Sequence, residues 1–120
     1  MSDLRPKHTQ IELGGKTYGL LFNLNAIDEI QDRFDIPISQ LSELMSDERK
    51  VFKVLKAILA ILINEAIDDG DSGEEHVTEA FVGRKTTVQD IANLKGKVFG
   101  AFTSGMPESD GDGDDPTMSE

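Results

Sequence analysis

The chain has 120 residues, of which 38% are hydrophobic, with no cysteine and a net charge of −11 at pH 7. Its length suits one domain with a single core, and the lack of cysteine excludes disulfides and cysteine zinc sites. The acidic balance disfavours nucleic acid and anionic membranes as partners. Residues 1–10 lack an apolar run, and the longest one, residues 57–63, is far below the roughly 20 residues that cross a bilayer. We therefore expect no signal peptide and no membrane span.

Residues 1–8 are polar and predict a flexible N-terminal arm. The following residues 9–13 and 16–22 flank a Gly-Gly pair and predict a β-hairpin. A two-residue type I′ turn needs positive φ twice, which Gly14 and Gly15 supply without steric cost. The resulting register puts five apolar side chains on one face, which we expect to pack on helices because an isolated hairpin is marginally stable. These side chains are Ile11, Leu13, Tyr18, Leu20 and Phe22.

Asn23 is expected to cap a first helix that ends near Asp35, because Pro37 disfavours helical backbone at the residue before it. Ser39 is expected to cap a short second helix, and Ser46 or Asp47 to begin a long third one. The buried stripe predicted for the first helix is Leu24, Ile27, Ile30 and Phe34.

The third helix, residues 51–67, is the most apolar stretch of the chain. Its only charged or amide side chains are Lys53, Lys56, Asn64 and Glu65. A helix that is apolar nearly all round must be covered on two or three sides. Two interpretations stay open: all of its apolar surface is core, or one sector meets another chain. The candidate partner-binding residues are Phe52, Leu55, Leu59, Leu62, Ile63, Phe99 and Phe102.

Two capping boxes are predicted in the C-terminal half, Ser72 with Glu75 and Thr86 with Gln89. The first should begin a short helix that bears Val77, Ala80 and Phe81 and ends at Gly83. The second precedes a final helix over residues 88–103, whose predicted apolar stripe is Val88, Ile91, Leu94, Val98, Phe99 and Phe102.

Residues 105–120 predict a disordered acidic tail, because they contain almost no apolar side chain. The segment 106–120 has six carboxylates and no Lys or Arg, which leaves −5 for residues 1–105. The expected organisation is an arm (1–8), a compact helical domain with an N-terminal hairpin (9–104) and this tail. The fold class is mainly α with a small β-hairpin, an α+β arrangement built round one long apolar helix.

No catalytic constellation is recognisable, so we expect neither an enzyme nor a cofactor. The loop 68–79 aligns with a calcium-binding EF-hand at Asp68 and Glu79, but Gly70 and Glu75 break that pattern. A solvated turn with a helix cap explains the loop, and we predict no metal. His8 and His76 are the only histidines. A nucleophile-base pair needs a Ser or Cys held near a histidine, and nothing in the sequence fixes that geometry at either position.

The order of parts, IELGGKTYGLLFNLNAIDEIQDRFD and then a long apolar helix and a polar C-terminus, resembles the tail assembly chaperones of long-tailed bacteriophages and their prophage and gene-transfer-agent relatives. The resemblance covers residues 9–104. It implies a non-enzymatic, self-associating protein of the host bacterial cytoplasm. Such a protein binds the tape measure protein, keeps it soluble during tail tube assembly and is absent from the mature virion. The resemblance carries over no site residues.

Two other classes remain open. An acidic DNA mimic or regulatory inhibitor would need carboxylates arrayed on a folded face, whereas over half of the net charge lies in residues 106–120. A structural tail subunit would be found in purified virions.

Overall fold

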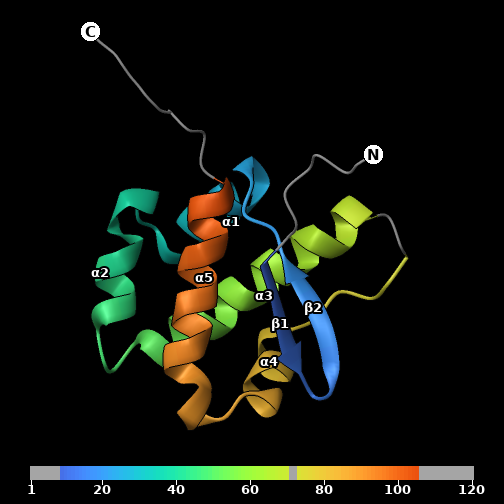
Figure 1. The fold of residues 1–120 in the computed structure, drawn as a ribbon. Helices are drawn as coiled ribbons and strands as arrows, with labels where there is room; N and C mark the ends of the chain where they lie inside the picture. Colours follow the sequence, from blue (N-terminus) through green and yellow to red (C-terminus); the bar gives the residue numbers. More distant parts are fainter. Residues whose placement is uncertain (1–8, 71–72, 106–120) are drawn as a thin grey trace, which may run out of the picture.

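The computed structural model describes residues 9–70 and 73–105, and it has the predicted class: mainly helical, with one N-terminal hairpin (Figure 1). The long helix α3 runs through the middle and contacts β2 and the four other α-helices. The arm and nearly all of the tail lie outside the described residues, but Gly105, assigned to the tail from the sequence, is the last residue of α5. The elements are β1 (Thr9–Leu13), β2 (Lys16–Leu20), α1 (Leu24–Phe34), the 3-10 helix η1 (Ile38–Gln40), α2 (Leu41–Ser46), α3 (Val51–Gly70), α4 (Glu79–Lys85), the 3-10 helix η2 (Val88–Asp90) and α5 (Ile91–Gly105).

The hairpin has the predicted turn and register. Gly14 and Gly15 have φ of +61° and +84°, and Ile11 pairs with Tyr18. All five side chains of the predicted face are buried. The chain then turns onto the central helix, where the backbone N–H of Leu21 donates to the Leu62 carbonyl at 3.1 Å.

Helix α1 is capped by Asn23, as predicted. Its Oδ1 accepts the Ala26 N–H at 2.9 Å, and its Nδ2 donates to Glu65 of α3 at 2.9 Å. The prediction that Leu24 is buried was wrong, because this side chain is 81% exposed. Ala26 and Ile30 set the buried face, and Leu24 lies about 160° from Ala26 around the helix.

The expected cap at Ser39 was also wrong. Ser39 lies inside η1, and α2 begins only at Leu41. Asp47, one of the two predicted starts of the long helix, forms a turn in which its Oδ1 accepts the Arg49 N–H at 2.9 Å. The Val51 N–H then donates to the Asp47 carbonyl, and α3 begins.

Both capping boxes predicted in the C-terminal half were misplaced. Thr78 caps α4 by accepting the Phe81 N–H at 3.0 Å, so Glu75 precedes the helix; Ser72 lies outside the described residues. The second box joins Thr87 and Asp90, where a carboxylate provides a charge-assisted acceptor for the Thr87 hydroxyl at 2.9 Å. Gly83, the expected end of the short helix, lies within α4.

Burial on α5 follows a narrower stripe than predicted. Leu94, Val98 and Ala101 are buried, whereas Val88 is 75% exposed and Phe99 36% exposed. The 3-10 turn before α5 changes the angular phase between Val88 and the helix, so Val88 leaves the stripe.

Three surface contacts hold the segment 73–79 against the rest of the molecule. Arg33 donates two hydrogen bonds to the Glu79 carboxylate, both at 3.2 Å, and His76 Nε2 lies 2.8 Å from Asp68 Oδ1. Lys16 donates to Glu74, and this hydrogen bond raises the pKa of Lys16 above its ordinary value. Exposed pairs of this kind contribute at most about 1 kcal/mol each.

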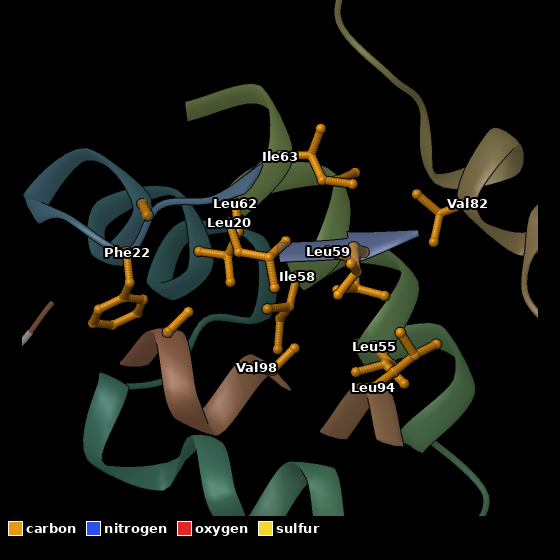
Figure 2. Packing of buried hydrophobic residues seen from close by; sticks show 14 of the residues in the cluster. Leu20, Phe22, Leu55, Ile58, Leu59, Leu62, Ile63, Val82, Leu94 and Val98 are labelled. Atoms are coloured by element: carbon orange, nitrogen blue, oxygen red, sulfur yellow. The ribbon is translucent and has the colours of Figure 1, made fainter. Parts of the chain in front are cut away.

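The core is arranged around α3. Leu20 approaches it from β2, Val82 from α4, and Leu94 and Val98 from α5, as Figure 2 shows. Most of the apolar side chains of α3 are therefore buried by other parts of the same chain. Of the two interpretations left open by the sequence, the intramolecular core holds for most of the helix, and Phe52 near its start is the largest exposed exception.

Candidate partner-binding pocket

A pocket with a volume of about 420 Å³ opens between the first half of α3, the helix α4 and the segment that leads into α5. At this pocket the start of α3 is only partly covered by its own chain, since Phe52 stays partly exposed. The lining residues are Phe52, Leu55, Lys56, Leu59, Ala80, Val82, Gly83, Arg84, Thr86, Thr87, Val88 and Ile91.

The floor of the pocket is apolar. Leu55 and Leu59 lie one turn apart on the same face of α3, and each is only 1% exposed. Val82 projects from α4 toward this face (Figure 2). The rim carries Phe52, which is 46% exposed, and the still more exposed Val88. An occupant would thus meet large apolar side chains at the entrance and reach the floor between them.

Among the described residues of the lining, the charged ones are Lys56 and Arg84, and none carries a carboxylate. Neither side chain forms an ion pair or hydrogen bond within the described part of the chain. The stem of Lys56 crosses α4 at Gly83, where an added Cβ would lie 2.9 Å from Lys56 Cδ. Lys56 therefore covers apolar surface with its stem while its ammonium group stays available to a ligand.

Thr86 adds a polar group without a partner among the residues that the structure describes. Its Oγ1 is buried and forms no hydrogen bond to any described residue. A buried hydroxyl in this state costs about 1–3 kcal/mol relative to a satisfied one. The neighbouring Thr87 differs, because its hydroxyl is held by Asp90.

The predicted partner-binding residues separate into three groups. Phe52, Leu55 and Leu59 come together at the pocket. Leu62 and Ile63 are fully buried in the core and are not among the lining residues of the pocket. Phe99 and Phe102 lie on α5 outside the pocket lining, and the Phe102 ring packs against Phe22 with centroids 4.6 Å apart.

Sequence reasoning missed the half of the pocket that α4 and η2 supply. Val88 had been assigned to a buried stripe, and Arg84 and Lys56 had no assigned role. The available signal was charge: residues 49–56 and 84–97 hold eight of the twelve basic residues of the chain. Whether these two basic segments come together depends on the path of the chain between α3 and α4, which the sequence does not show.

The lining suits binding by apolar contact and positive charge, because most of its described residues are apolar and its two charged side chains are cations. Across residues 9–70 and 73–105, no three His, Asp or Glu side chains come together as a possible metal site. None of the helices in these ranges combines the length and apolarity needed to cross a bilayer. No family model, curated protein or solved structure matches the chain.

Proposed function

We propose that this protein is a tail assembly chaperone of a long-tailed bacteriophage or a related element. It binds the tape measure protein without enzymatic chemistry and keeps it soluble while the tail tube assembles. The observation that carries the proposal is the pocket at the start of α3, where Phe52 and Val88 expose apolar surface beside a preformed apolar floor. The resemblance of residues 9–104 to these chaperones gives the proposal its client.

The pocket supports the proposal because a tape measure protein is a long helical chain whose apolar stripes would aggregate before the tube encloses them. An amphipathic helix binds by inserting apolar side chains of one face into a groove of this kind. The burial of Leu62 and Ile63 restricts the proposed contact to the first half of α3 together with α4 and η2.

Co-expression with the tape measure protein, followed by pull-down, tests the proposal. We expect a complex with the unmodified chain and its loss with Val88→Asp, which puts a charge on the pocket rim. The matched control is Leu24→Asp. Both residues begin a helical segment, both are highly exposed, and Leu24 is not among the lining residues of the pocket. Absence of any complex, or equal loss with both variants, would contradict the proposal.

Self-association in the host bacterial cytoplasm and absence from the mature virion belong to the same proposal. Phe99 offers a partly exposed apolar contact on α5, away from the pocket. Sedimentation of the purified chain with and without Phe99→Ser measures self-association. A strictly monomeric chain at high concentration would contradict it. Mass spectrometry of purified virions tests the expected absence from the mature virion. Finding the protein there would favour the structural tail subunit.

The DNA-mimic alternative makes the opposite prediction for the tail. An acidic decoy should lose its binding when residues 106–120 are deleted, because six carboxylates are removed. A chaperone that uses the pocket should still bind its client and should become less soluble. The cationic lining of the pocket supports the chaperone interpretation of this face.

A further inference from the structure

We propose that the acidic C-terminal segment, residues 106–120, occupies the pocket of its own chain when no partner is bound. Met118 inserts between Phe52 and Val88, and the flanking carboxylates lie beside Lys56 and Arg84. This inference concerns the purified chain alone and does not depend on the identity of a client.

The chemistry of the segment complements that of the pocket. Residues 106–120 carry six carboxylates and no cation, and Met118 stands close to Asp114, Asp115 and Glu120. The pocket offers an apolar floor and two cations that pair with no described residue. Methionine is unbranched and polarisable, so its side chain adapts to an apolar pocket that was not shaped for one rigid group.

The length of the segment also fits. Ile91 lines the pocket and begins α5, whereas the chain leaves α5 at Gly105, the end of the helix far from α4 (Figure 1). The return path along α5 is about 21 Å at 1.5 Å per residue. The 13 residues from Gly105 to Met118 reach at most about 43 Å, and an unstructured chain of that length spans about 20 Å on average. A tether whose average span matches the distance gives the highest effective concentration.

Covering the pocket has a physical consequence for the free protein. It removes Phe52 and Val88 from water and brings opposite charges together in a chain of net charge −11. The attraction between the exposed charges is screened over about 8 Å at physiological ionic strength, so the contact should weaken as salt is added. A client with a larger apolar stripe would then displace the segment.

Paramagnetic relaxation in the full-length chain tests the contact. The chain has no cysteine, so Ser119→Cys accepts one nitroxide label beside Met118. We expect broadening of the methyl signals of Val88 and Ile91 at low salt and loss of that broadening in 1 M NaCl. The Leu24 methyl signals serve as the control, because Leu24 lies outside the pocket lining. Broadening at the pocket no greater than at Leu24 would overturn the proposal.

Two variants separate the charge from the apolar anchor. Lys56→Glu with Arg84→Glu should abolish the broadening, and Met118→Ser should reduce it, with the dispersion of the methyl spectrum reporting that the fold is intact. Unchanged broadening in both would overturn the proposed contact. A second sample mixes nitroxide-labelled chains with isotope-labelled chains that carry no nitroxide. Equal broadening of the methyl signals in the chains without a nitroxide would show an intermolecular contact and overturn the intramolecular arrangement. These measurements contain no tape measure protein, so their failure and failure of the co-expression test are separate outcomes.

Discussion

The side-chain amide of Asn64 pairs with the backbone of Val77: its Nδ2 donates to the Val77 carbonyl at 3.0 Å, and its Oδ1 accepts the Val77 N–H at 2.7 Å. The amide thus forms the two backbone hydrogen bonds that a neighbouring strand would supply, although Val77 lies in a segment without regular secondary structure. Thr78 follows at once and caps α4. This pair therefore helps to set where α4 lies against α3, and with it one wall of the pocket.

Asn64→Leu should lower the free energy of unfolding by about 2–4 kcal/mol, because it leaves two half-buried backbone groups without partners. Asn64→Asp keeps the acceptor for the Val77 N–H and should cost less. Urea denaturation of the three proteins measures the order of stability. Equal stability of Asn64→Leu and the unmodified chain would show that this pair does not hold α4.

Leu62→Ala and Phe52→Ala should differ sharply although both truncate apolar residues of α3. Leu62 is fully buried, so the cavity should cost about 2–5 kcal/mol. Phe52 is nearly half exposed at the pocket rim, so its truncation should cost about 1 kcal/mol or less. Thermal and chemical unfolding check the difference, and similar costs for the two variants would contradict the division of α3 into core and rim.

Thr86→Val should raise the free energy of unfolding by about 1 kcal/mol, because it removes a buried hydroxyl that has no hydrogen-bond partner in the described residues. Thr87→Val is the matched control at the neighbouring position. It breaks the capping box with Asp90 and should lower stability by about 1 kcal/mol. A loss of stability with Thr86→Val would reveal a partner for that hydroxyl.

Gly15→Ala and Gly96→Ala should shift stability in opposite directions, although an added Cβ meets open space at both positions. Gly15 has φ of +84°, so alanine there should cost about 1–2 kcal/mol in backbone strain. Gly96 lies inside α5, where alanine should add about 1 kcal/mol through helix propensity. Midpoints of urea unfolding measure both, and a neutral Gly15→Ala would contradict the type I′ turn.

The sequence alone determined the structure that depends on near neighbours. The paired glycines, the register of Ile11 with Tyr18 and the cap at Asn23 were all predictable, because each requires only residues a few positions apart. The second capping box was predicted one residue too early, at Thr86 with Gln89, and forms at Thr87 with Asp90 because the backbone reaches helical geometry only at Val88. Helical periodicity likewise showed that residues 51–67 are apolar nearly all round, but not which neighbours cover them.

Only the tertiary structure decided which apolar side chains remain exposed. Leu62 is covered because β2 packs against α3, whereas Val88 is uncovered because a 3-10 turn rotates it out of the stripe of α5. The pocket joins Phe52 to residues about 30 positions later, and Asn64 helps to set that path through its bonds to Val77. Contacts between distant segments depend on the packing of every element between them, which spacing along the chain does not encode.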